Sequence, residues 1–142
     1  MMIGLYVALA ALAIATALGL VWRSRGGVLR ERPERKDGEV ERLGETELGA
    51  SLGARATLVQ FSSAFCAPCR ATRRVLTEVT DLVDGVAHIE IDAESHLDLV
   101  RRLNILRTPT VLVLNADGDV VRRGSGLPRK ADVVAALGET VA

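Results

Sequence analysis

Hydrophobic residues along the chain form one long block and several short ones. The block Ile3–Trp22 contains no charged side chain, and a helix of that length would be about 30 Å long, the thickness of the hydrocarbon core of a bilayer. Tyr6 and Trp22 lie near its ends, where aromatic side chains favour the membrane interface. The pattern predicts a transmembrane anchor over residues 1–22. A cleaved signal peptide is the alternative, although such peptides carry a basic segment before a shorter apolar core.

The segment that follows, residues 23–47, is rich in charge and poor in apolar side chains. Its acidic and basic residues are equal in number, and Gly26, Gly27 and Pro33 disfavour regular secondary structure. Such a segment buries too little apolar surface to offset the entropy that is lost on ordering. We therefore predict a charged linker that holds a domain away from the membrane.

The distribution of basic residues predicts the orientation of the anchor. Arginine and lysine side chains cluster directly after the apolar block, and none precedes it. By the positive-inside rule, the amino terminus lies outside the cell and the rest of the chain in the cytoplasm. The predicted location is the cell membrane, with a single pass. The inverted topology, with an extracytoplasmic domain, is the alternative.

Shorter apolar runs predict an α/β domain over residues 48–142. Short β-branched runs are typical of strands, and apolar residues that recur every three to four positions are typical of helices. Strands are predicted at Thr57–Phe61, Val86–Asp92, Thr110–Leu114 and Asp119–Arg123. Helices are predicted at Thr46–Leu52 with a stop at Gly53, at Arg70–Val83, after a Ser95 cap with Leu97, Val100 and Leu103 facing the core, and from Pro128 to a stop at Gly138. This order gives a βαβ unit followed by a hairpin, and so a mixed sheet flanked by helices.

Composition argues against several classes of protein. Basic and acidic residues number 18 each, so the net charge is zero and no basic surplus is present to bind nucleic acid. Two cysteines are too few for a disulfide-stapled scaffold or a four-cysteine zinc site. His88 and His96 are separated by seven residues, which lies outside the usual histidine spacing of zinc sites. We therefore expect no metal and no nucleic-acid partner.

The candidate chemistry lies at Cys66 and Cys69, between a predicted buried strand and the first long helix. A cysteine at the start of a helix lies beside unpaired backbone N–H groups and the positive end of the helix dipole. Both favour the thiolate, so we expect the pKa of Cys66 to fall below about 8.5, the value of a free thiol. Cys69, one turn further on, is predicted to be less exposed, and Pro68 stiffens the loop between the two.

In several segments the sequence resembles the thioredoxin family. The resemblance is carried by Thr57–Phe61, Phe65-Cys66-Ala67-Pro68-Cys69, Val86–Asp92, Thr108-Pro109-Thr110 and Gly126. A CxxC motif alone is weak evidence, but one that follows a buried strand and precedes a Thr-Pro-Thr some forty residues later is specific. The resemblance implies a thioredoxin-like fold for the domain.

The same resemblance implies roles for individual residues. Cys66 is the nucleophile that attacks a substrate disulfide, and Cys69 is the resolving cysteine. The proline that matches Pro109 is cis in the family and faces the cysteines, and the residue that matches Thr108 offers its backbone to an extended substrate. The substrate-binding residues implied are Phe65, Ala67, Pro68, Thr108 and Pro109.

Three positions depart from the family pattern. Phe65 stands where family members usually carry Trp, Gln60 where they carry a buried Asp, and His88 where they carry the accompanying Lys. The Asp is thought to take the proton from the resolving thiol, and the amide of Gln60 does not titrate. We therefore predict that His88 or water takes this proton, or that resolution is slower.

The predicted function is that of a membrane-tethered thiol-disulfide oxidoreductase that reduces protein disulfides. It needs no cofactor beyond the redox-active Cys66–Cys69 disulfide, and its reductant is a thioredoxin-reductase-type flavoenzyme or a dithiol protein. Two alternatives remain. One is an extracytoplasmic reductase for cytochrome maturation or envelope thiol homeostasis, and the other is a tethered interaction module whose cysteines do not turn over.

Overall fold

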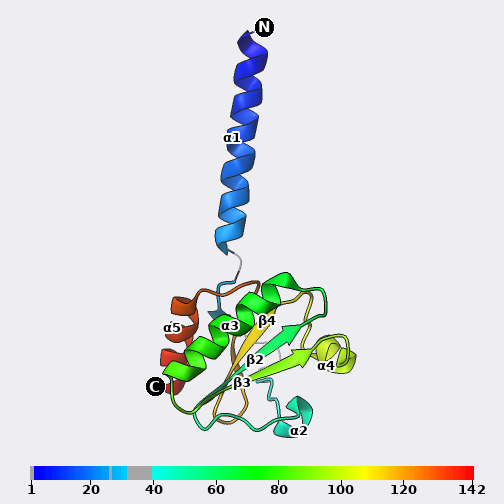
Figure 1. Ribbon diagram of the computed structural model, residues 1–142, viewed down its shortest axis with the longest axis vertical. Helices are drawn as coiled ribbons and strands as arrows, with labels where there is room; N and C mark the ends of the chain where they lie inside the picture. The colour runs from blue at the N-terminus through cyan, green and yellow to red at the C-terminus, as the bar shows by residue number, and fades with distance from the viewer. Residues whose placement is uncertain (1, 26, 32–39) are drawn as a thin grey trace.

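The structure is a computed structural model that describes residues 2–25, 27–31 and 40–142 (Figure 1). In chain order its elements are α1 (Met2–Arg25), β1 (Arg30–Glu31), α2 (Glu45–Leu48), β2 (Ala56–Ser62), α3 (Ala67–Leu82), β3 (Val86–Asp92), α4 (Leu97–Arg102), β4 (Thr110–Asn115), β5 (Val120–Ser125) and α5 (Lys130–Val141). The strands form one sheet in the order β1-β5-β4-β2-β3. β2 and β3 are parallel and the other neighbours are antiparallel, so the predicted mixed α/β sheet is confirmed.

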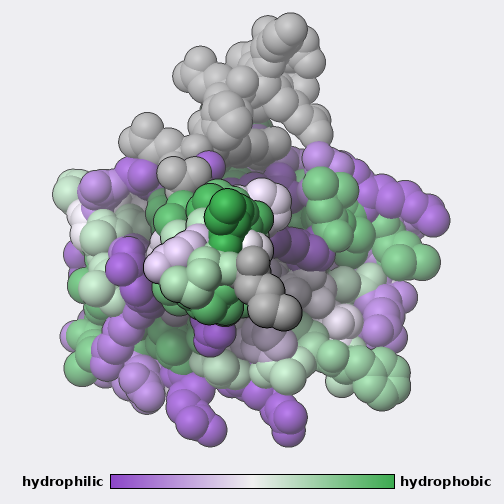
Figure 2. Space-filling model, turned by 90° about the horizontal axis from the view of Figure 1, so that it is seen from above, coloured by the Kyte–Doolittle hydropathy of each residue, from purple (hydrophilic) through white to green (hydrophobic). Residues whose placement is uncertain are grey.

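The first helix, α1, stands apart from the rest of the protein. Its described side chains are exposed, and Figure 1 shows it projecting from the domain. By length and composition Met2–Ser24 can cross a membrane, and a signal sequence would pass the same test. The predicted apolar helix is therefore confirmed, and its place in a membrane stays a prediction. Figure 2 looks at the domain from the side on which α1 rises.

The central strand β2 is buried on both faces because helices cover the sheet from two sides. Its residues alternate between two apolar cores. Leu58 packs with side chains of α3 and α5, whereas Val59 and Phe61 pack with side chains of α2, β3 and the end of α4. The mostly apolar composition of this strand thus has a direct structural cause.

The ends of two helices differ from the prediction. α2 ends at Gly49, which adopts a left-handed backbone (φ 68°), before the predicted stop at Gly53. α5 continues through Gly138 to Val141, because Val133 and Leu137 anchor the helix in the core. A stop at Gly138 is therefore wrong.

The start of α4 also departs from the prediction. The hydroxyl of Ser95 donates to the carboxylate of Asp92 at 2.6 Å, so it does not cap the helix, and His96 is the N-cap residue. Leu103 is buried as predicted, whereas Leu97 is 52% exposed and does not face the core.

The domain extends into the predicted linker. Leu29 and Leu43 are buried in the two cores, β1 pairs with β5, and Leu43 N–H donates to the carbonyl of Gly118 at 2.9 Å. Burying a leucine stabilises a fold by about 1.5–3 kcal/mol, which explains how two isolated leucines order a charged segment. Residues 23–25 of the predicted spacer continue α1, and residues 27–31 and 40–47 belong to the domain, so a spacer is wrong for these parts. Residues 26 and 32–39, with Pro33, lie outside the described residues.

Candidate redox site at the start of α3

The candidate site is formed where β2 ends and α3 begins. β2 ends at Ser62, and Cys66 is the N-cap residue of α3, with Pro68 at the second position of the helix. Cys66 and Cys69 are joined by a disulfide, with their Cα atoms 5.3 Å apart. Cys69 N–H donates to the carbonyl of Cys66 at 3.2 Å, so the two residues lie on one turn, as the spacing predicts.

The two cysteines differ in exposure. Cys69 is 2% exposed, whereas Cys66 is only half-buried. Phe65, the residue before it, is fully exposed. A hollow beside the disulfide is lined by residues that include Ser62, Cys66 and Arg70. Cys66 is therefore the more accessible residue of the pair.

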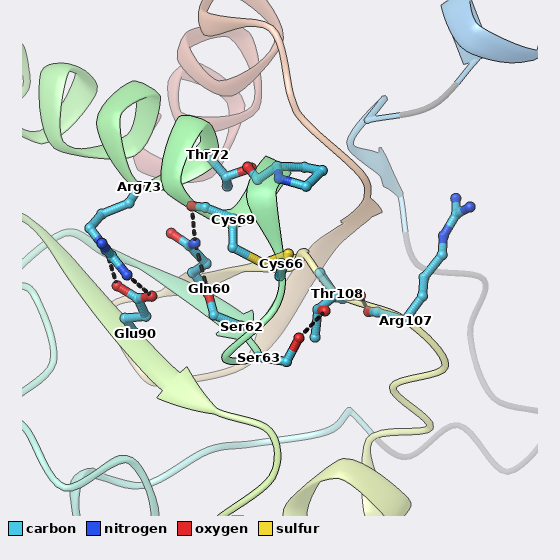
Figure 3. The surroundings of a disulfide bond; sticks show 12 residues. Gln60, Ser62, Ser63, Cys66, Cys69, Thr72, Arg73, Glu90, Arg107 and Thr108 are labelled. Atoms are coloured by element: carbon cyan, nitrogen blue, oxygen red, sulfur yellow. Dashed lines mark hydrogen bonds and ion pairs between the residues drawn. A yellow bond between two sulfur atoms is a disulfide. The ribbon is translucent and has the colours of Figure 1, made fainter.

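A second loop lies beside the disulfide. The Thr108–Pro109 peptide bond is cis, as the resemblance implies. The hydroxyls of Ser63 and Thr108 are 3.0 Å apart and share a hydrogen bond, and Gly126 N–H donates to the carbonyl of Pro109 at 2.8 Å. Figure 3 shows Thr108 next to Cys66. The structure thus brings together the cysteine motif, the Thr-Pro loop and the loop at Gly126.

Gln60 lies beneath the first turn of α3 and is fully buried. Its Nε2 donates to the carbonyl of Cys69 and to the hydroxyl of Ser62, each at 2.9 Å (Figure 3). Its Oε1 accepts from Nε2 of His88 at 3.1 Å. The amide therefore positions the backbone of Cys69. A proton-transfer role for Gln60 or His88 stays a prediction.

The surroundings of His88 keep its imidazole neutral near neutral pH. Burial lowers its pKa from the ordinary value, the charge of Glu90 acts in the opposite direction, and the charge of Arg73 lowers it further. Arg73 and Glu90 form a two-bond ion pair with N···O distances of 2.5 and 2.6 Å. The hydrogen bond from Arg73 lowers the pKa of Glu90 despite its partial burial.

The sequence alone misses several residues of the site. Ser62 and Ser63 hold Gln60 and Thr108 through their hydroxyls, and Glu90 neutralises Arg73, one of the basic residues in the first turns of the helix. The alternation of β3 puts Glu90 on the same face as His88, which is the one signal that points to it. The described residues contain no cluster of three or more His, Cys, Asp or Glu able to hold a metal ion.

Comparison with known proteins agrees with this geometry. The Thioredoxin family model matches residues 43–139. Thioredoxin C-2 of Corynebacterium nephridii is 31% identical over 85 residues, which cover 59% of this chain and 78% of that protein. The thioredoxin of Mycobacterium tuberculosis strain H37Rv is 29% identical over 85 residues, covering 59% of this chain and 72% of the relative.

Solved structures show the same fold. Chloroplastic thioredoxin z superposes with a TM-score of 0.58 at 24% identity, covering 72% of this chain and 94% of its own. A mutant thioredoxin from Halobacterium salinarum NRC-1 gives a TM-score of 0.56 at 17% identity, covering 62% of this chain and 76% of its own.

Fold and site together define a thiol-disulfide oxidoreductase that works through a CxxC cysteine pair. The chain belongs to the thioredoxin family. The matched region begins at residue 43, so α1 and β1 lie outside it.

Proposed function

We propose that the protein is a membrane-tethered reductase of protein disulfides, with Cys66 as nucleophile and Cys69 as resolving cysteine. The observation that carries this proposal is the difference in exposure within the pair, because Cys69 is 2% exposed and Cys66 is half-buried. A nucleophile has to reach the substrate, whereas a resolving thiol acts only inside the mixed disulfide.

The reaction proceeds in two exchanges. The Cys66 thiolate attacks one sulfur of the substrate disulfide, which forms a mixed disulfide and releases the other substrate sulfur as a thiolate that takes up a proton. Cys69 then loses its proton and attacks the sulfur of Cys66, which releases the second substrate sulfur. The substrate gains two electrons and two protons, and the Cys66–Cys69 disulfide is formed.

The enzyme is recycled by an external reductant, a thioredoxin-reductase-type flavoenzyme or a dithiol protein, which supplies two electrons. The similarity of Ala67-Pro68 to the Gly-Pro pair of reducing thioredoxins supports the direction of transfer. No further cofactor takes part in the proposal.

The substrate binds across the loops that surround Cys66. Phe65 is fully exposed and available for apolar contact. The backbone of Thr108 and the ring of Pro109 lie on the neighbouring loop, which is tied to Ser63 by the shared hydroxyl hydrogen bond. Ala67 and Pro68 complete the rim at the start of α3.

The membrane tether is α1, and the basic residues that follow it favour a domain in the cytoplasm. A membrane-impermeant maleimide added to intact reduced cells tests the side. We expect no labelling of Cys66 until the cells are opened. Labelling in intact cells would favour the extracytoplasmic reductase, and release of the protein by alkaline washing would contradict the tether.

The decisive experiment for the activity uses Cys69→Ser with insulin as the disulfide substrate. Without a resolving thiol, Cys66 is expected to remain bonded to an insulin chain, giving an adduct that dithiothreitol releases. The matched control is the double variant Cys66→Ser/Cys69→Ser, which is expected to give none. If Cys69→Ser forms no adduct, the reductase is contradicted, and the alternative of a tethered interaction module whose cysteines do not turn over is favoured.

A further inference from the structure

The chain that leaves α1 docks on the domain almost at once. Gly27 N–H donates to the carbonyl of Ser125 at 2.7 Å, Leu29 is 8% exposed within the core beneath α3 and α5, and Arg30 pairs with Arg123 as β1 adds to the edge of the sheet. Residues 27–31 are here called the juxtamembrane strap. The strap belongs to the domain, although it lies outside the region shared with other thioredoxins.

Two glycines allow the strap to approach closely. Gly27 has φ +82°, and a Cβ there would lie 1.9 Å from the carbonyl oxygen of Leu127. On the facing strand, a Cβ at Gly124 would lie 2.9 Å from Cδ2 of Leu29 and 3.0 Å from the carbonyl oxygen of Val28. A side chain at either position would displace the strap.

The register places the strap at the redox end of the sheet. Ser125 pairs with Thr110, and Thr110 pairs with Phe61, which lies close to the cysteine loop. Gly126, next to Ser125, donates to the carbonyl of Pro109. Three interstrand steps of about 4.8 Å separate β1 from β2, so β1 lies roughly 15 Å to the side of the strand that leads to the cysteine loop. Figure 3 draws the end of α1 and β1 on the side of Arg107.

The connection between anchor and strap is short. α1 ends at Arg25 and the strap is bonded from Gly27, so a single residue joins them. One residue spans at most about 3.6 Å. While the strap stays docked, the redox end of the domain cannot move far from the end of α1.

Exposed apolar side chains lie on the loops at this end. Phe65, Leu106 and Leu127 are 100%, 85% and 45% exposed, and they come from the cysteine loop, the loop before Thr108 and the loop after Gly126. Figure 2, which looks along α1 toward the domain, shows both green and purple side chains around it. The loops at this end therefore expose apolar side chains on three neighbouring segments.

From these observations we propose that the strap restricts the enzyme to disulfides at the membrane surface, in the juxtamembrane part of another membrane protein. The inference rests on the proposed function and narrows its substrate class. The short connection holds Cys66 at a fixed height above the bilayer and excludes disulfides that lie far from it. The exchange chemistry is the one given above.

The test uses the full chain reconstituted with its domain outward in phosphatidylcholine vesicles. Two model substrates are single-span peptides whose disulfide lies directly after the span or at the end of a helical spacer about 45 Å long, roughly 30 residues at about 1.5 Å each. Insulin is the soluble substrate. Because confinement raises the effective concentration of a substrate within reach, we expect the near disulfide to be reduced at least about tenfold faster than the far one.

A variant with a Gly/Ser insertion of about 70 residues after Arg25, whose root-mean-square length of roughly 45 Å matches the far spacer, is expected to lose this preference and to keep its rate on insulin. Gly27→Val, which detaches the strap, is expected to weaken the preference less. Gly138→Ala is the matched control, since no atom lies within 4 Å of the added methyl group. Equal rates on the near and far peptides, or a preference that the insertion does not diminish, would overturn this inference. If insulin is still reduced in that case, the proposed function is upheld. Failure to reduce any substrate would overturn both.

Discussion

At one end of the central sheet, the turn between β4 and β5 satisfies its polar groups from within, whereas at the other end the loops leave apolar side chains exposed. In the turn, Oδ1 of Asn115 accepts from the N–H groups of Asp117 and Asp119, and Asp119 forms an ion pair with Arg42. At the redox end, Phe65 is fully exposed. The first end satisfies its polar groups within the chain, and the second leaves an apolar side chain exposed, as the proposed binding of a substrate requires.

The same contrast appears within one strand. Thr57 and Gln60 of β2 are both fully buried polar residues. Thr57, toward the turn end, accepts one hydrogen bond from Gly53 N–H, while Gln60 bonds to Cys69, Ser62 and His88. The buried hydroxyl of Thr57 thus makes one local hydrogen bond near the turn end. The buried amide of Gln60 takes part in a network of hydrogen bonds at the redox end.

The largest effect is expected from Cys66→Ser, which removes the nucleophile. Insulin reduction should fall at least about 100-fold, because a hydroxyl does not exchange with disulfides. Asp117→Asn at the turn end is the matched change and should leave the rate unaltered. A Cys66→Ser protein that keeps a tenth of the activity would contradict the assignment of the redox end.

The next effect compares Gln60→Leu with Thr57→Val. We expect Gln60→Leu to lower the free energy of unfolding by about 2 kcal/mol, because it leaves buried partners unsatisfied, and Thr57→Val by about 1 kcal/mol. Urea denaturation of the two variants measures this. Gln60→Leu should also slow turnover, whereas Thr57→Val should not. If Gln60→Leu and Thr57→Val lose equal stability and equal activity, the network around Gln60 does not distinguish the redox end from the turn end.

A smaller effect concerns pH. Burial lowers the pKa of His88 in the folded protein, so the unfolded chain binds the proton first as pH falls. The stabilisation is complete above about 6.5, the ordinary histidine value, and is lost as pH falls through the lower pKa of the folded state. Between about pH 7 and 5.5, a range that spans the ordinary histidine value, the wild type should therefore lose more stability than His88→Gln. A parallel loss in both proteins would show that His88 is not the group responsible.

The smallest effects are expected from two of the surface ion pairs, Arg73–Glu90 near the redox end and Arg42–Asp119 near the turn end. Arg73 lowers the pKa of Glu90 and Arg42 lowers the pKa of Asp119, so each pair stabilises above the ordinary carboxyl range and loses this as pH falls below it. Glu90→Gln and Asp119→Asn should each cost less than Thr57→Val, and the difference from wild type should vanish in about 1 M salt. A larger effect of Glu90→Gln on activity alone would mark Glu90 as a positioning residue.

Much of the fold could be predicted because the central strands β2 and β4 are short, mostly apolar runs and β3 alternates between apolar and polar residues. The bounds predicted for Val86–Asp92 are those that β3 has, since its alternation mirrors one buried and one exposed face. Cys66, Cys69 and Pro109 are found from the spacing of short motifs. In each case the signal is local in the sequence.

What the sequence missed depends on contacts between distant segments. Leu29 and Leu43 look isolated in a charged segment, and only the cores that receive them explain their burial. The hydrogen-bond partners Cys69 and His88 of Gln60 could not be predicted either, because they belong to other elements of the fold. The stop predicted at Gly138 is wrong because a helix end is set by packing as much as by local propensity.

The most direct test of the account is the rate at which iodoacetamide alkylates each cysteine of the reduced protein near neutral pH, followed by mass spectrometry of the two labelled sites. Because Cys66 is half-buried and Cys69 is 2% exposed, we expect Cys66 to react at least about tenfold faster, as accessible thiolates do. Equal rates, or faster labelling of Cys69, would contradict the claim that Cys66 is the nucleophile on an open redox face.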